Sequence, residues 1–133
     1  MEKNRIEIPT AAALSYIGDA RHSLYVRIML TERGICKSAE LNSESLKYVT
    51  AEAQARMLEK ILPLFTEEEA ALYKRAFNSS HLNKPKHASG KDYRMATGFE
   101  AIIGLLTWRG EEQRLDYLLK ISHSEDIKND SEN

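Results

Sequence analysis

Cysteine and proline are scarce in this chain, and long apolar runs are absent. Its 133 residues include one cysteine, three prolines and six glycines. The single Cys36 cannot form a disulfide within the chain, and no stretch has the length and apolarity of a signal peptide or a membrane span. We therefore expect a protein of a reducing compartment, the cytoplasm, without a membrane anchor.

Neither sign of charge dominates the sequence. The chain has 19 basic and 20 acidic side chains, for a formal net charge of −1. This balance excludes a generally basic coat for nucleic acid but leaves room for a local basic patch. The length fits one domain that can bury a core without staples, so we expect a domain over residues 1–123 and a short acidic tail over 124–133.

Stretches that alternate apolar and polar residues are also absent, so the sequence predicts an all-α fold. Thr10 is a candidate N-cap for the first helix, Pro63 ends the second, and Thr66 with Glu69 forms a capping box before the third. We expect helices over about 10–34, 43–62, 67–77, 92–109 and 111–122. The main apolar stripe of the first helix comprises Ala13, Ile17, Ala20, Leu24 and Ile28. Residues 78–91 are expected to form a long functional loop.

Asp19 stands out because the first helix is apolar almost all round, with its main stripe on nearly the opposite side. Such a helix should be central, which predicts that Asp19 is at least partly buried. An unpaired buried carboxylate is costly, so it should take up a proton or find a cation. The cation could be a metal ion or the side chain of a lysine or arginine.

Glu100 poses the same question in the fourth predicted helix, where small residues surround it. Gly18 and Gly104 each cost their helices about 1 kcal/mol relative to alanine, and close backbone approach is the usual compensation. If the two glycines bring these helices together, Asp19 and Glu100 could share one ion. A salt bridge for each acid is the alternative.

Three ordered segments carry a family resemblance: "LSYIGDA", "LKYVTAEAQARMLEKILPLFTEEEAALYKRAFN" and "KDYRMATGFEAIIGLL". Together they closely resemble the Mini-III branch of the ribonuclease III family, over roughly residues 10–122, without an attached RNA-binding domain. The resemblance implies an all-α endonuclease that acts as a homodimer and hydrolyses double-stranded RNA with Mg²⁺. It also implies the 23S ribosomal RNA precursor as the substrate, and leaves open whether a ribosomal protein assists.

Asp19 matches the aspartate of the family's first motif and Glu100 the glutamate of its second, which implies that both are catalytic magnesium ligands. Larger members have two further acids, at the positions of Ser15 and Thr97 here. The same thinning is typical of Mini-III and leaves the number of ions open; we expect one held directly and a second recruited by RNA. Arg21 and His22 replace the apolar and aromatic residues that are more usual after the first motif. The change either alters packing at the dimer interface or provides a contact with RNA.

A local basic patch lies between Lys74 and Arg94, where six basic groups face one acid, Asp92. Duplex RNA is bound mainly through phosphates and 2′-hydroxyls, which lysines on a loop can contact. A solvated surface loop is the plainer interpretation. The residues predicted to bind RNA are Lys84, Lys86, Lys91 and Arg94. Tyr93 suits either core packing or a phosphate contact, and Gln54 and Lys47 are expected to have ordinary surface roles.

Other chemistries find little support in the sequence. The four histidines, His22, His81, His87 and His123, lack the spacing of a zinc site, and no glycine-rich Walker loop precedes a helix. Two rivals to a nuclease remain: a non-catalytic scaffold of the same fold that binds double-stranded RNA, and a helical adaptor that binds only protein. Retention of both Asp19 and Glu100 favours the nuclease.

Overall fold

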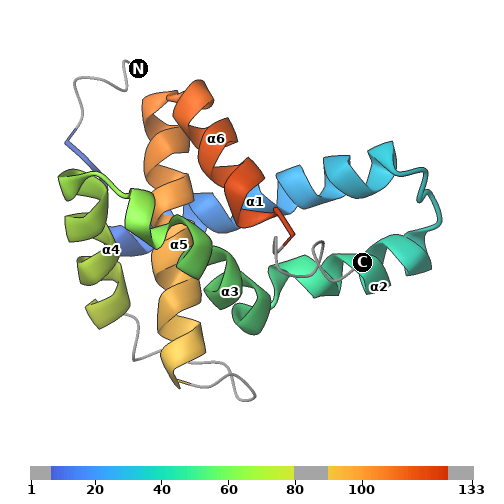
Figure 1. Cartoon of the computed structure of the whole chain (residues 1–133), viewed down its shortest axis with the longest axis horizontal. Coiled ribbons are helices and arrows are strands. Elements are labelled where there is room, and N and C mark those ends of the chain that lie inside the picture. Colours follow the sequence, from blue (N-terminus) through green and yellow to red (C-terminus); the bar gives the residue numbers. More distant parts are fainter. Residues whose placement is uncertain (1–6, 80–89, 126–133) are drawn as a thin grey trace.

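The fold is all-α, as the sequence predicts. The computed structural model describes residues 7–79 and 90–125. Within these ranges there are six α-helices, one short 3-10 helix and no strand (Figure 1). The helices are α1 (Ala11–Glu32), α2 (Ser38–Val49), α3 (Ala51–Ile61), η2 (Leu62–Leu64), α4 (Glu67–Ser79), α5 (Gly90–Arg109) and α6 (Glu112–Ser122).

The predicted starts of α1 and α4 are confirmed by their caps. The Thr10 hydroxyl accepts a hydrogen bond from the Ala13 amide at 3.1 Å. In α4 the Glu69 amide donates to the Thr66 hydroxyl at 3.1 Å, while the Thr66 amide donates to the Glu69 carboxylate at 2.9 Å. Each cap satisfies amide groups that a helix leaves unpaired in its first turn.

The expected single helix over 43–62 is wrong, because the chain forms two helices there. Thr50 breaks the run with an extended backbone, at φ −74° and ψ 159°. Its hydroxyl accepts a hydrogen bond from the Ala53 amide at 3.2 Å, so it caps the start of α3. A threonine cap followed by an alanine-rich turn carries this signal in the sequence.

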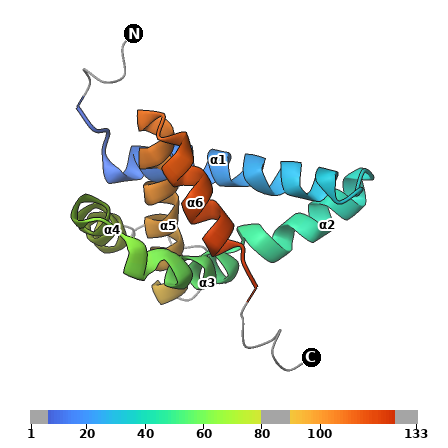
Figure 2. The same cartoon turned by 45° about the horizontal axis from the view of Figure 1, so that its top comes forward.

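Helix α5 lies at the centre of the body and packs against α1, α3, α4 and α6 (Figures 1 and 2). This position explains why it is apolar nearly all round. Its side chains form the middle of the hydrophobic core, which includes Phe99, Ile102, Ile103, Leu105 and Leu106.

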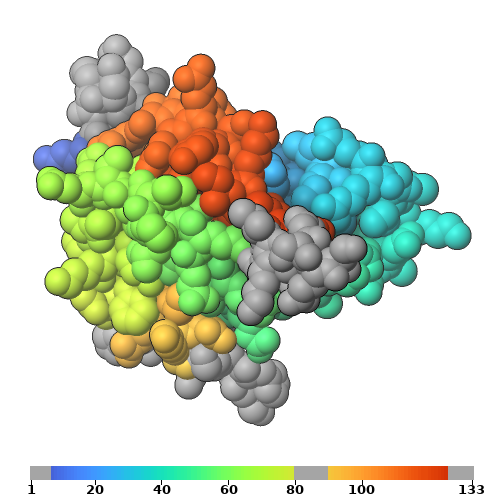
Figure 3. Space-filling model, viewed as in Figure 1, coloured from blue at the N-terminus to red at the C-terminus, as the bar shows by residue number. Residues whose placement is uncertain are grey.

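The C-terminal half of α1 and the antiparallel α2 project from this body as an arm (Figures 1 and 3). The predicted core stripe of α1 does not face the body: Leu24 is 50% and Ile28 49% exposed, and Ala13 and Ala20 are exposed as well. The face of α1 turned to its neighbours carries Leu14, Ser15, Gly18, His22, Val26 and Leu30. This face is the buried one because Gly18 on it lets α5 approach closely.

Part of the predicted organisation lies outside the described residues. This holds for Lys84 and Lys86, for most of the predicted loop over 78–91, and for the tail beyond residue 125. Within the part of the chain that the structure describes, no helix is long and apolar enough to cross a membrane.

Candidate active site

Two glycines let α1 and α5 cross with their backbones in contact. A Cβ atom placed on Gly18 would lie 1.7 Å from the carbonyl oxygen of Glu100. One placed on Gly104 would lie 1.8 Å from the carbonyl oxygen of Leu14. No residue with a side chain fits at either position without moving the helices apart. The predicted approach of the two helices through these glycines is therefore confirmed.

The crossing brings together two carboxylates that are far apart in the sequence. Asp19 follows Gly18, and Glu100 lies one helical turn before Gly104, so their side chains come within hydrogen-bonding reach of each other. Glu100 is partly buried, whereas Asp19 is exposed. The expectation that Asp19 is partly buried is wrong, because it lies at the edge of the covered face of α1 and the buried acid is its partner on α5.

Glu100 has strongly perturbed acidity. Burial, followed by the hydrogen bond and negative charge of Asp19, raises its pKa to about 9, while hydrogen bonds from Gln54 and Ser15 act in the opposite direction. Two carboxylates within hydrogen-bonding reach of each other cannot both be ionised at low cost. Glu100 therefore holds a proton at neutral pH when no cation is present. Within the described residues, no ion pair ties either acid to a lysine or arginine.

Ser15 and Thr97 occupy the two positions where larger ribonuclease III enzymes have acids, and their hydroxyl groups make different hydrogen bonds. The Ser15 hydroxyl donates to Glu100 Oε1 at 3.3 Å, so it supports the carboxylate. The Thr97 hydroxyl donates to the Tyr93 carbonyl of its own helix at 2.9 Å and so is turned away from the pair. A serine and a threonine thus leave Asp19 and Glu100 as the acids of the site.

Gln54 corrects the sequence interpretation, which expected a surface role. It is 2% exposed, donates a hydrogen bond to Glu100, and its Nε2 lies 3.1 Å from Nδ1 of His22. His22 is fully buried against Phe99, with the ring centroids 5.1 Å apart, so it belongs to the core and not to an RNA-binding or dimer surface. A polar residue on the apolar stripe of α3, between two alanines, was the signal for Gln54.

The donor set fits a hard divalent cation. Mg²⁺ prefers oxygen ligands, keeps several waters and is commonly held by one or two carboxylates together with substrate phosphate. A cation between Asp19 and Glu100 would replace the proton that Glu100 otherwise holds. Within the described residues no group of three or more histidine, cysteine, aspartate or glutamate side chains could hold a metal ion, so the candidate ligands here are the two acids alone.

Of the four residues predicted to bind RNA, Lys91 and Arg94 lie within the described part of the chain. Lys91 is exposed at the start of α5. Arg94 is partly buried, and its guanidinium lies over the ring of Phe77 with 5.7 Å to the centroid. This contact leaves Arg94 packed against α4, with the ring face stabilising its charge.

Comparisons with known proteins show the family of the chain. The model of the Ribonuclease III domain matches residues 12–110. A Mini-ribonuclease 3 from Streptococcus pneumoniae is 39% identical over 116 residues, covering 86% of this chain and 91% of the relative. One from Symbiobacterium thermophilum is 38% identical over 107 residues, covering 80% and 82%. A crystal structure of a protein from Fusobacterium nucleatum matches with a TM-score of 0.78 and 28% identity, covering 91% of this chain and 96% of that one.

The chain therefore belongs to the ribonuclease III family of endoribonucleases, with the Mini-ribonuclease 3 proteins among its relatives. The matched residues include both α1 and α5, and so both helices of the glycine crossing.

Proposed function

We propose that the protein is a magnesium-dependent endoribonuclease that cleaves double-stranded RNA, with Asp19 and Glu100 as catalytic residues that hold the ion. One observation carries the proposal: two carboxylates from separate helices meet at a backbone crossing that only glycine permits, and neither is paired with a lysine or arginine among the described residues. A structural pair of acids would be costly without a cation to neutralise it.

The side chains of the site prepare it for the ion. Glu100, in its ionised form, and Asp19, from the solvent side, would hold the ion. Ser15 and Gln54 donate hydrogen bonds that favour the ionised form of Glu100. When bound, Mg²⁺ lowers the pKa of a coordinated water and offsets negative charge that develops on the scissile phosphate.

The exposed apolar stripe of α1 supports a homodimer. Leu24 and Ile28 are half exposed on a helix whose opposite face is buried in the body. Large apolar side chains in a row on one helix face are typical of a surface covered by a partner. A two-fold pair of copies would hold two sites, one for each strand of a duplex.

For RNA binding we propose Lys84, Lys86, Lys91 and Arg94. Lys91 and Arg94 lie in the first turns of α5, the helix that carries Glu100, so charge there reaches the same duplex. We propose the paired ends of the 23S ribosomal RNA precursor as the substrate and the cytoplasm as the location; a ribosomal protein could assist by shaping the RNA. Replacing the three lysines with alanine should weaken binding and flatten its salt dependence, and unchanged affinity and slope would contradict this assignment.

Cleavage of a duplex RNA with and without Mg²⁺ tests the function. The wild-type protein should cut only with the metal, and Asp19→Asn or Glu100→Gln should abolish cutting while leaving the fold intact. Asp116→Asn, an exposed acid on α6, is the matched control and should cut normally. A shift of the RNA without cutting by the wild-type protein would identify the non-catalytic scaffold, and neither shift nor cutting would identify the adaptor.

A further inference from the structure

Two buried polar side chains, Gln54 and His22, and the partly buried His123 link the candidate active site to the far side of the core. Gln54 Nε2 lies 3.1 Å from His22 Nδ1, and His22 Nε2 lies 2.8 Å from His123 Nε2. They come from α3, from α1 and from the residue that follows α6. At its inner end Gln54 lies within hydrogen-bonding reach of Glu100 and favours its ionised form, so the three side chains form a line that ends at the carboxylate.

The chemistry of these groups fixes the direction of each hydrogen bond. The amide nitrogen of Gln54 only donates, so its contact at 3.1 Å makes His22 Nδ1 the acceptor and leaves the second amide hydrogen for Glu100. Neutral His22 therefore carries its proton on Nε2 and donates to His123 Nε2. His123 in turn carries its proton on Nδ1, a buried atom without a hydrogen-bond partner in the described part of the chain.

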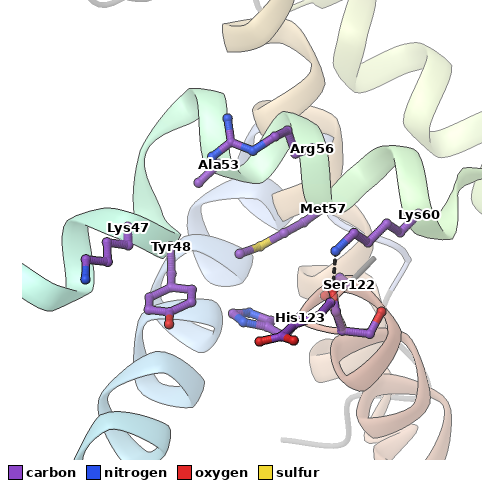
Figure 4. Close-up of a pocket in the computed structure, with 10 residues that line it drawn as sticks. Lys47, Tyr48, Ala53, Arg56, Met57, Lys60, Ser122 and His123 are labelled. Carbon is purple, nitrogen blue, oxygen red and sulfur yellow. Dashed lines mark hydrogen bonds between the residues drawn. The ribbon is translucent and has the colours of Figure 1, made fainter. Parts of the chain in front are cut away.

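Aromatic contacts hold both imidazole rings in place. The ring of His22 meets Phe99 edge to face at 5.1 Å, and the ring of His123 lies 4.9 Å from that of Tyr25 and stacks on Tyr48 at 5.6 Å. Figure 4 shows His123 beside Tyr48 and below Met57, on the wall of a pocket of about 430 Å³. Lys60 on α3 donates to the carbonyl oxygen of Ser124, which fastens the chain beside His123.

Both histidines stay neutral at physiological pH, which preserves this pattern. Burial, followed by the nearby His123 and Arg21, lowers the pKa of His22 to about 3. Burial, followed by Lys60 and Arg33, lowers the pKa of His123 to about 4. Neither ring therefore becomes a double donor, which would turn the His22 contact with Gln54 from attraction into repulsion.

We propose that Gln54, His22 and His123 form a positioning chain that aims the Glu100 carboxylate at Asp19 for the shared cation; this inference rests on the proposed metal site. Glu100 has a long side chain, and its 3.3 Å contact with Ser15 is weak support by itself. An amide can rotate to present either its oxygen or its nitrogen. His22 Nδ1 accepts only, so it locks Gln54 in the orientation that donates to Glu100.

Manganese binding to the RNA-free protein measures the effect without catalysis. Gln54→Met keeps the shape of the side chain and removes its hydrogen bonds, and it should weaken Mn²⁺ binding by about tenfold or more, as loss of such supporting contacts commonly does. Electron paramagnetic resonance of free Mn²⁺ gives the affinity. Gln113→Met, the same change at an exposed position of α6, is the matched control and should bind as the wild type does.

A double-mutant cycle tests whether His22 acts through Gln54. His22→Phe keeps a ring against Phe99 and should weaken Mn²⁺ binding less than Gln54→Met does. In the Gln54→Met background, the same change should cause no further loss of affinity. Additive losses of affinity would overturn the proposed positioning chain, because they would show that the two residues act on the site independently.

The proton positions provide a spectroscopic test. Nitrogen NMR of the imidazole rings should show the Nε2–H form of His22 and the Nδ1–H form of His123 in the folded protein near pH 7. The opposite form of His22 would overturn the proposal, because its Nδ1 would then donate to Gln54 and no longer dictate which amide atom faces Glu100.

The outcomes separate this inference from the proposed function. If Glu100→Gln binds Mn²⁺ as tightly as the wild type, the proposed metal site is wrong, and the positioning chain that depends on it is wrong as well. If Glu100→Gln loses binding while Gln54→Met retains it, only the positioning chain is overturned. A Gln54→Met protein with a lower melting temperature but unchanged affinity gives this second result, since its defect would be structural alone.

Discussion

Gly18 and Glu100 are in direct backbone contact across the α1 and α5 interface, where a Cβ on Gly18 would lie 1.7 Å from the Glu100 carbonyl oxygen. The close backbone contact between the helices and the meeting of Asp19 with Glu100 therefore occur at the same crossing. Whatever separates the helices also separates Asp19 from Glu100.

Gly18→Ala should both destabilise the protein and weaken metal binding at the proposed site. Because the new methyl group meets backbone, which cannot rotate away, α1 and α5 must move apart, at a cost of about 3 kcal/mol. Urea denaturation and Mn²⁺ titration measure the two effects. Gly90→Ala, at the start of α5 with nothing within 4 Å of its Cβ position, is the control and should change neither. Normal Mn²⁺ affinity in a folded Gly18→Ala protein would contradict the coupling.

The metal-free protein should lose stability as pH rises from 7 to 9. The folded pKa of Glu100, about 9, is above its ordinary value of 4.5. Its contribution to the free energy of unfolding is therefore complete below pH 4.5 and is lost as pH rises through 9, by at most about 1.4 kcal/mol per pH unit. The two histidines of lowered pKa are neutral in the folded state throughout this window, and with an ordinary pKa of 6.5 they are largely neutral in the unfolded state too. Urea denaturation at pH 7, 8 and 9 should show the slope in the wild type and its absence in Glu100→Gln; equal slopes would contradict the assignment.

Arg114→Met should destabilise the protein by about 3 kcal/mol. Arg114 donates to the Glu69 carboxylate at 2.7 Å, and Glu69 is only 4% exposed. Burial by itself raises the pKa of Glu69, but the hydrogen bonds from Arg114 and Thr66 outweigh it and hold the pKa below its ordinary value. Without Arg114 a buried charge is left unpaired. Arg109→Met breaks an exposed pair with Glu68 and should cost about 1 kcal/mol or less. Thermal denaturation compares them, and equal losses would refute the distinction.

Leu24→Glu should convert the proposed homodimer into a monomer. The new charge would be placed within the apolar stripe of α1, where a partner's apolar surface cannot solvate it. Leu62→Glu on η2 is the matched control, since Leu62 is 41% exposed and lies outside the stripe. Sedimentation velocity should give a dimer for the wild type and for Leu62→Glu and a monomer for Leu24→Glu. A monomeric wild type would end the homodimer proposal.

Local features of the structure were largely predictable. The helix starts at Thr10 and Thr66 follow from side-chain oxygens that accept from amides within one turn. The approach of α1 to α5 follows from glycines whose cost within a helix needs compensation. Each of these inferences needs only neighbours along the chain or one assumption about which helices meet.

The errors about burial share one cause. Ile28 and Leu24 lie on an apolar stripe of α1 that is turned outward, and Gln54 is polar but buried. Hydrophobicity identifies apolar faces but does not tell which of two such faces of a helix its own chain covers. Nor does it show that a buried amide is satisfied by a carboxylate and an imidazole from other helices.

The sequence by itself determined most of the helices, the family and the two candidate acids, because caps, periodicity and ordered motifs are properties of residues near one another in the chain. Only the tertiary structure decided which acid is partly buried, which face of α1 is exposed, and how Gln54 and two histidines are arranged next to Glu100. Those outcomes depend on burial and hydrogen-bond geometry, and such properties arise only when segments distant in the sequence pack together.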